Sequence, residues 1–158
     1  MARFDKNRFR TENQTWETPD SLFNDLNKEF HFDIDLSASK ENTKCKRFIS
    51  QKEDALKQIW KGKGWLNPPY GGGSVNSLKN WVKKSYNETR KKGCLVVMLI
   101  PARTNTQWWH KYCMKAKEIR FIKGRPKFKG NIHGLPQPLA LIVFDNTSEN
   151  PTLKSQEV

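Results

Sequence analysis

Apolar side chains recur with regular spacing along most of the chain, and the spacing changes between helical and strand-like periods. In residues 19–30 the apolar positions share one helical face, which predicts an amphipathic helix. Thr18 and Pro19, directly before them, are typical of an N-cap followed by proline at the first helical position. Residues 32–36 alternate between apolar and acidic side chains, so a strand is predicted there.

Short apolar runs and helical stripes continue to alternate through the rest of the chain. Strands are predicted at 65–66, 94–100, 118–122 and 139–144, and helices after Ser50, around 78–89 and at 107–116. The run 94–100 is apolar throughout, which is typical of a strand buried on both faces of a parallel sheet. This alternation, with a hairpin-like connection after residue 122, predicts an α/β fold: a doubly wound, mostly parallel sheet with an antiparallel C-terminal edge.

The length of 158 residues fits one domain and leaves little room for a second. Residues 1–15 are polar and lack periodicity, so we expect a flexible basic arm. The predicted domain spans 16–144, and 145–158 is expected to be a polar tail. No apolar run approaches the ~20 residues that a membrane-spanning helix needs.

The charge balance indicates a polyanionic partner. Lys and Arg number 29 against 16 Asp and Glu, for a formal net charge of +13. Nucleic acid is the first candidate partner and an anionic membrane the second. The charge is also unevenly placed, because the charged side chains of residues 17–35 are mostly acidic and those of residues 111–130 are mostly basic. We therefore expect the two ends of the domain to differ electrostatically.

Cysteine usage excludes two classes of small domain. The three cysteines form no Cys-x-x-Cys pair, so a disulfide scaffold or a zinc ribbon is not expected, and a reducing cytoplasm is the predicted compartment. His110 and Cys113 have the spacing of two metal ligands but lack a third, so no metal is predicted.

A rigid corner follows the strand at 65–66, where a ligand of an open α/β sheet would bind. In Asn67-Pro68-Pro69-Tyr70 the prolines fix the backbone and remove two donors, which leaves carbonyl oxygens, one carboxamide and one aromatic face. Such a corner suits a planar substrate with an amino group. The Asn67 side-chain oxygen and the Pro68 carbonyl would accept its two hydrogens, and Tyr70 would stack on its ring.

Two acceptors also make chemical sense, because an aromatic amine has its lone pair delocalised into the ring. When two acceptors bind both hydrogens of the amine, they favour a pyramidal nitrogen whose lone pair points at an electrophile. An ordinary Pro-Pro turn is the alternative interpretation of these four residues. The glycines that follow, Gly71 to Gly73, would allow a ligand to approach closely and so favour the functional interpretation.

Several motifs together resemble the phage-type DNA N-6-adenine methyltransferase family, a Dam-like group that uses S-adenosylmethionine. The resemblance covers roughly residues 16–144 and rests on the order and spacing of five segments. These are Trp16-Glu17-Thr18-Pro19, the run from Phe32 to Ala38, Asn67-Pro68-Pro69-Tyr70-Gly71, the run from Pro101 to Thr106 with Trp108-Trp109-His110, and Gly124-Arg125 with Phe128.

The resemblance implies a role for each matching residue. Asn67, Pro68, Pro69 and Tyr70 would be the catalytic set, with adenine N6 held by Asn67 and Pro68. The cofactor set would be Trp16, Thr18, Pro19, Asp35, Ser37, Ala38 and Asp54. Within it, Thr18 would contact the methionine end of S-adenosylmethionine, Asp35 and its turn would line the pocket, and Asp54 would accept from the adenine amino group. The fold implied is that of the S-adenosylmethionine-dependent methyltransferases.

DNA is the partner that the charge and the resemblance favour, and the double-stranded form is expected. The residues expected to contact it are Arg103, Arg125, Lys127, Phe128 and Lys129, with Phe128 stacking beside an extruded nucleotide. Arg103 could equally meet the sheet edge. Neither a membrane nor an obligate protein partner is expected, and a phage-encoded enzyme would act in the cytoplasm of its bacterial host.

Two alternatives stay open. The same corner could methylate another planar amine, namely cytosine N4, an RNA base or a protein glutamine. The turn at Leu36–Ser39 lacks the glycines usual in such cofactor sites, so the chain could also be a DNA-binding domain with weakened cofactor affinity.

Overall fold

The computed structural model describes residues 17–70, 77–129, 137–147 and 150–158. Its elements in chain order are α1 (Asp20–Phe30), β1 (Ile34–Asp35), β2 (Arg47–Phe48), two 3₁₀ turns (Gln51–Glu53 and Ala55–Lys57), β3 (Gly62–Leu66), α2 (Leu78–Thr89), β4 (Cys94–Pro101), α3 (Gln107–Lys111), a 3₁₀ turn (Cys113–Lys115), β5 (Glu118–Ile122), β6 (Leu139–Phe144) and β7 (Thr152–Gln156).

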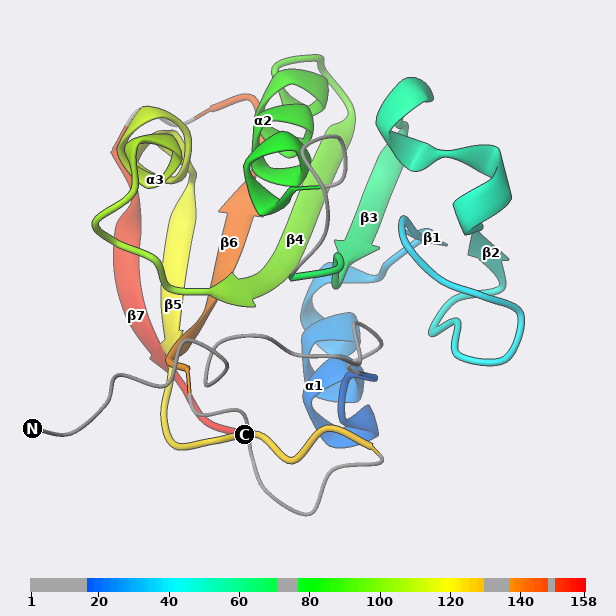
Figure 1. The fold of residues 1–158 in the computed structure, drawn as a ribbon, viewed down its shortest axis with the longest axis horizontal. Helices are drawn as coiled ribbons and strands as arrows, with labels where there is room; N and C mark the ends of the chain where they lie inside the picture. The colour runs from blue at the N-terminus through cyan, green and yellow to red at the C-terminus, as the bar shows by residue number, and fades with distance from the viewer. Residues whose placement is uncertain (1–16, 71–76, 130–136, 148–149) are drawn as a thin grey trace, which may run out of the picture.

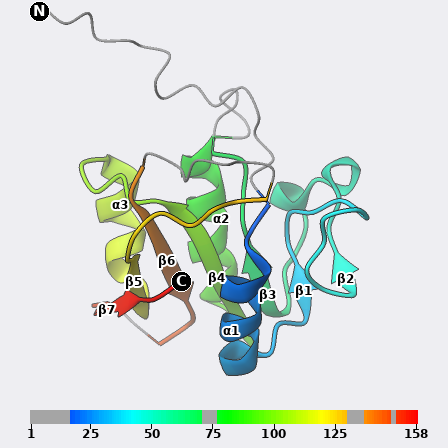
Figure 2. The same cartoon turned by 90° about the horizontal axis from the view of Figure 1, so that it is seen from below.

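The described strands form one sheet in the order β2-β1-β3-β4-β6-β5-β7 (Figures 1 and 2). The strands from β2 to β4 pair in parallel, and β6 is antiparallel to both β4 and β5. The predicted α/β class with a mostly parallel sheet is therefore confirmed. The antiparallel strand lies inside the sheet, however, and the C-terminal edge is β7, which runs parallel to β5.

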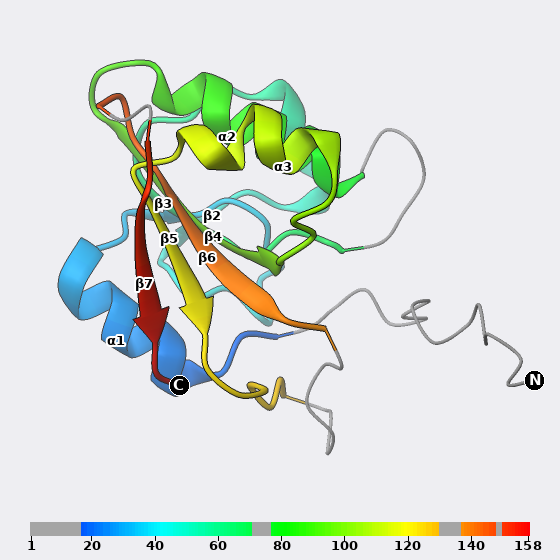
Figure 3. The same ribbon diagram turned by 90° about the vertical axis from the view of Figure 1, so that its left-hand side faces the viewer.

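Helices cover both faces of the sheet, with α2 and α3 on one side and α1 on the other (Figure 3). Strand β4 supplies both cores, because alternate residues point to opposite faces. Val96, Met98 and Ile100 belong to the core under α2 and α3, whereas Val97 and Leu99 belong to the core under α1. This double burial is what the unbroken apolar run predicts.

The start of α1 differs by one residue from the prediction. Pro19 occupies the N-cap position and Asp20 is the first helical residue, so Thr18 does not cap the helix. The Thr18 hydroxyl instead accepts a hydrogen bond from the side chain of Asn67. The sequence pattern located the helix correctly, but the Thr18 hydroxyl forms a tertiary contact that a local sequence pattern cannot predict.

Two strands were not predicted. Strand β2 has only two residues, too few for any periodicity to register. Strand β7 lies in the segment expected to be a polar tail, and this expectation is corrected for residues 152–156. Its five residues are almost all exposed, and pairing with β5 is carried by backbone hydrogen bonds, which a polar sequence can form as readily as an apolar one.

In the described part of the chain, no helix has both the length and the hydrophobicity needed to cross a bilayer.

Candidate active site

The corner at Asn67 stands at the carboxyl end of β3, as the sequence predicts, and is tied to the neighbouring strand β4. Pro68 is buried, and Asn67 and Pro69 are half-buried. The hydroxyl of Tyr70 lies 3.1 Å from the carbonyl oxygen of Leu99 in the middle of the sheet. The loop after β3 is thereby fastened to β4 at its fourth residue.

The carboxamide of Asn67 has a defined partner at each end. Its Nδ2 donates to Thr18 Oγ1 at 3.0 Å, and its Oδ1 accepts from the Tyr70 hydroxyl at 2.9 Å. A carbonyl oxygen has two lone pairs, so the hydrogen bond from Tyr70 alone does not exhaust the accepting capacity of Oδ1. The corner thus offers an oriented acceptor.

The ring of Tyr70 is packed inside the domain. Its exposed fraction is 7%, and it belongs to the core under α1, together with Leu22 and Trp65. Burial raises the pKa of the Tyr70 hydroxyl above its ordinary value, because the charged form would lose its hydration. In this arrangement Tyr70 acts on Asn67 through its hydroxyl, and its ring would have to leave the core to stack on a base.

Asp35 organises the loop that follows β1. Its side chain is 3% exposed and accepts from the backbone N–H groups of Ser37 at 3.3 Å and of Lys44 at 3.0 Å. Burial raises the pKa of this carboxyl to about 6, and the two hydrogen bonds only partly oppose the shift. Asp35 therefore ties Ser37, in the predicted cofactor turn, to Lys44 farther along the same loop.

The turn itself needs no glycine. Among the described residues, the non-glycine positions with positive φ are His31 and Asp54, so Ser37, Ala38 and Ser39 all have ordinary backbone conformations. Ser37 and Ala38 are half-buried, and the Ala38 N–H donates to the Ile49 carbonyl at 3.1 Å. The lack of glycine introduces no backbone strain here.

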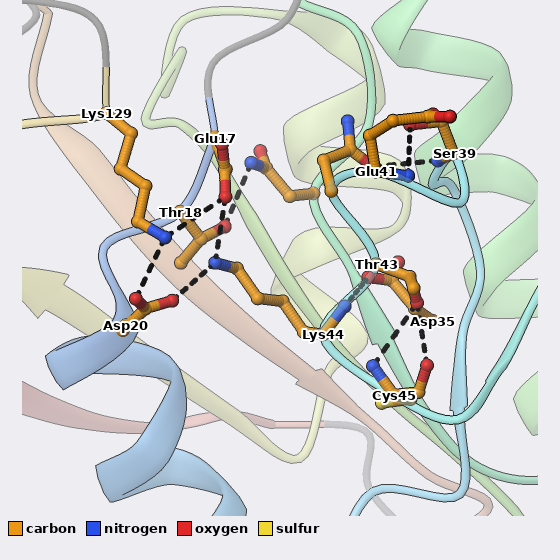
Figure 4. Close-up of polar contacts among 12 residues, drawn as sticks. Glu17, Thr18, Asp20, Asp35, Ser39, Glu41, Thr43, Lys44, Cys45 and Lys129 are labelled. Atoms are coloured by element: carbon orange, nitrogen blue, oxygen red, sulfur yellow. Dashed lines mark hydrogen bonds and ion pairs between the residues drawn. The ribbon is translucent and has the colours of Figure 1, made fainter.

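A four-residue ion cluster joins the predicted cofactor segment to the basic stretch (Figure 4). Lys44 Nζ lies 2.7 Å from Asp20 and 3.4 Å from Glu17, and Lys129 Nζ lies 2.8 Å and 3.2 Å from the same two acids. Hydrogen bonds from Lys129 and Lys44 lower the pKa of Asp20 to about 2. The acidic and basic segments expected at opposite ends of the domain therefore meet at this cluster, which corrects that expectation.

Sequence reasoning missed Lys44, Glu17 and Asp20 as members of this site. The two acids flank Thr18 and Pro19, so the resemblance pointed to their neighbourhood. Lys44 gave no signal, because it is one of several lysines in a polar loop and reaches the acids across 24 and 27 residues of chain. Its side chain is nevertheless only 9% exposed.

Asp54 lies apart from the ion cluster. Its backbone is left-handed, with φ of 52°, and its side chain is 37% exposed and forms an ion pair with Lys57 at 3.1 Å. Nothing in the described structure links it to Asp35 or to Asn67. Trp16, the remaining residue of the predicted cofactor set, lies outside the described residues.

In residues 125–129 the side chains alternate between exposed and buried positions. Arg125, Lys127 and Lys129 are exposed, whereas Pro126 and Phe128 are buried. The expectation that Phe128 stacks beside an extruded nucleotide is corrected, because its exposed fraction is 1% and it packs in the core under α1. A period of two in Arg-Pro-Lys-Phe-Lys is the sequence signal that could have predicted this.

The cations of this segment are not equivalent. Lys129 forms a backbone bridge with Glu17 and ion pairs with Glu17 and Asp20, so acidic side chains of the same protein compensate its charge. Hydrogen bonds from its side chain to Asp20 and Glu17 raise the pKa of Lys129. Arg125 and Lys127 are also exposed, but neither forms an ion pair with another described residue.

Arg103 lies beside a cleft at the carboxyl end of β4. The cleft has a volume of about 450 Å³ and is lined by Pro101, Ala102, Arg103, Asn105, Gln137 and Pro138. Because Tyr70 is bonded to Leu99, two residues before the end of β4, the Asn67 corner and this cleft belong to the same edge of the sheet. Arg103 is half-buried there.

Within the described residues, no group of three or more His, Cys, Asp or Glu side chains is arranged to hold a metal ion. The polar groups described at this edge are the Asn67 carboxamide, the hydroxyls of Thr18 and Tyr70, and the ion cluster.

Comparison with known proteins finds similar sequences. A family model described as DNA N-6-adenine-methyltransferase (Dam) matches residues 6–150. The DNA N-6-adenine-methyltransferase of Haemophilus phage HP1 is 30% identical over 158 residues, which covers 94% of this chain and 88% of the phage protein. The protein of the same name from Escherichia phage T1 is 34% identical over 112 residues, which covers 68% of this chain and 44% of that protein.

Proposed function

Because the chain belongs to the DNA N-6-adenine-methyltransferase family, we propose that it transfers a methyl group from S-adenosylmethionine to N6 of an adenine turned out of DNA. Membership of the family implies a methyl donor and DNA as the substrate. The observation that supports the finer proposal most strongly is the oriented carboxamide of Asn67, which directly precedes Pro68 at the end of β3.

Asn67 and Pro68 would hold the amino group of the base. Asn67 Oδ1 would accept one N6 hydrogen, and the Pro68 carbonyl would accept the other. S-adenosylmethionine supplies an electrophilic methyl group on a sulfonium sulfur. Asn67 and Pro68 would stabilise the positive charge that develops on N6 as the bond to the methyl carbon forms and the carbon–sulfur bond breaks. One N6 proton then leaves to solvent, which restores a neutral amine.

The residues around the turn after β1 fit a donor with a zwitterionic amino-acid end. Lys44 would receive its carboxylate, and Glu17 or Asp20 its ammonium group, by exchanging ion pairs that exist within the cluster. Thr18, Pro19 and the half-buried turn of Ser37 and Ala38 lie along the same segments. Trp16 and Asp54 complete the proposed cofactor set on the strength of the family resemblance alone.

Exposed cations would hold the DNA backbone. Arg125, Lys127 and half-buried Arg103 are available near this edge of the sheet, in a chain with a net charge of +13. Extruding a base from a duplex costs a few kcal/mol, which phosphate contacts on this surface would help to offset. Lys129 would contribute only by leaving its ion pairs. Two of the relatives are phage proteins, which supports the cytoplasm of a bacterial host as the site of action. We propose double-stranded DNA as the form that is methylated there.

Removal of the Asn67 carboxamide tests this proposal. The purified wild type and the Asn67→Ala variant are incubated with unmethylated duplex DNA and S-adenosylmethionine labelled in the methyl group. Wild type should label the DNA, and Asn67→Ala should lose transfer while keeping its affinity for DNA. Asn24→Ala, which removes an exposed asparagine of α1, is the matched control and should behave as wild type. Undiminished turnover in Asn67→Ala would show that the corner does not hold the reacting amine.

A further inference from the structure

Thr18 is bonded to the catalytic corner although 49 residues separate it from Asn67. Its hydroxyl lies in the segment that enters α1, between Glu17 and Pro19, and is drawn in Figure 4 beside the ion cluster. The residue is 2% exposed, and its Oγ1 accepts from Asn67 Nδ2 at 3.0 Å. Because Pro19 is the N-cap of α1, this hydroxyl has no capping role.

The orientation of the Asn67 carboxamide matters because its two ends have similar shape and opposite hydrogen-bonding character. A half-turn about the last side-chain bond would exchange Oδ1 for an NH₂ group. Facing the amino group of a base, the NH₂ end would offer donors to a group that is itself a donor. The corner can hold that amine only while the oxygen faces it.

We propose that Thr18 is a positioning residue, whose hydroxyl holds the Asn67 carboxamide with its oxygen, and not its NH₂ group, turned toward the amino group of the substrate. Thr18 takes the Nδ2 end, and the Tyr70 hydroxyl takes one lone pair of Oδ1. The inference rests on the proposed function. It differs from the cofactor role that the family resemblance assigns to Thr18, because its partner is a side chain of this protein.

One consequence is a direct link between the corner at Asn67 and the proposed cofactor residues around Lys44 and Asp35. Thr18 follows Glu17 and precedes Asp20 by two positions, and both acids bind Lys44, whose backbone N–H is bonded to Asp35. Displacement of the entry to α1 would therefore be transmitted to Asn67 through a single hydrogen bond.

Isosteric substitution at Thr18 tests the inference. Thr18→Val removes the hydroxyl and keeps the shape, whereas Thr18→Ser keeps the hydroxyl. Loss of one orienting hydrogen bond should lower kcat of Thr18→Val about tenfold, with KM for S-adenosylmethionine within twofold of wild type. Thr18→Ser should restore most of kcat. Thr89→Val is the control, because it removes the hydroxyl of a buried residue of α2 that is bonded to the Ser85 carbonyl. It loses a buried hydrogen bond elsewhere and should leave kcat unchanged.

A wild-type kcat in Thr18→Val would overturn the inference. An increase in KM for S-adenosylmethionine with unchanged kcat would do so as well, because it would assign Thr18 to the cofactor. A second readout does not depend on catalysis: the side-chain amide resonances of Asn67 in ¹⁵N NMR should shift, and its protons should exchange faster, in Thr18→Val and not in Thr89→Val. If the wild type transferred no methyl group, the proposed function would fail while these resonances still tested the role of Thr18. Unchanged Asn67 resonances would overturn that role.

Discussion

The hydroxyl of Tyr70 lies 2.9 Å from the side-chain oxygen of Asn67, with the tyrosine ring buried beneath the corner. The same hydroxyl is 3.1 Å from the carbonyl oxygen of Leu99, so its single proton is shared between the proposed catalytic acceptor and the backbone of β4. The hydroxyl therefore ties the side chain of Asn67 to the central strand of the sheet.

Tyr70→Phe should lower both stability and turnover. The variant keeps the ring and its packing but loses the hydrogen bonds to Asn67 and Leu99, at a cost of about 1 kcal/mol in the free energy of unfolding. We expect a several-fold decrease in kcat, measured with labelled S-adenosylmethionine and unmethylated DNA. Tyr112→Phe, in the opposite core, is the control and should keep its turnover. A Tyr70→Phe variant as active as wild type would leave the hydroxyl without a role in catalysis.

Lys127 and Lys129 should respond differently to neutralisation although they are two residues apart. Lys127 is exposed, so Lys127→Gln should weaken binding to duplex DNA and reduce the slope of log affinity against log salt by about 1. Lys129 is paired with Glu17 and Asp20, so Lys129→Gln should change this slope little and should lower the melting temperature instead. Equal salt slopes for the two variants would contradict the distinction.

Asp35 should make the protein less stable as pH rises from about 4 to about 6. The pKa of this carboxyl in the folded protein is about 6, above the ~3.9 of an unfolded aspartate, so the folded state binds the proton more tightly in this range. The free energy of unfolding contributed by this group falls by about 3 kcal/mol across the range. Asp35→Asn should remove that dependence in urea unfolding curves, whereas Asp25→Asn, exposed on α1, should keep it. Parallel curves for wild type and Asp35→Asn would contradict the assignment.

The sequence alone was sufficient to predict the helices and strands whose buried residues recur at a regular spacing. The helix beginning near Pro19 and the strand at 94–100 were predicted because one or two of their faces enter a core, which forces apolar residues to recur at fixed spacing. The location of Asn67 at the end of a strand followed from the same pattern. Phe128 shows the limit of such prediction. It was expected to contact DNA because its neighbours are charged, but it lies in the core.

Contacts between distant segments carried no local signal. The bond from Asn67 to Thr18, and the approach of Lys129 to Glu17 and Asp20, depend on how α1 and the segment 125–129 dock. Strand β7 was missed for another reason, because backbone pairing at an exposed sheet edge places few demands on side chains. Family motifs identified the neighbourhood of the site, and only the fold could say which residues within it touch.

Identification of the methylated nucleoside tests the central claim most directly. The wild-type protein is incubated with unmethylated duplex DNA and S-adenosylmethionine, and the DNA is digested to nucleosides and analysed by mass spectrometry. We predict N6-methyladenine as the product, absent from a parallel reaction with Asn67→Ala. N4-methylcytosine as the product, or DNA that the protein binds but leaves unmethylated, would contradict the account.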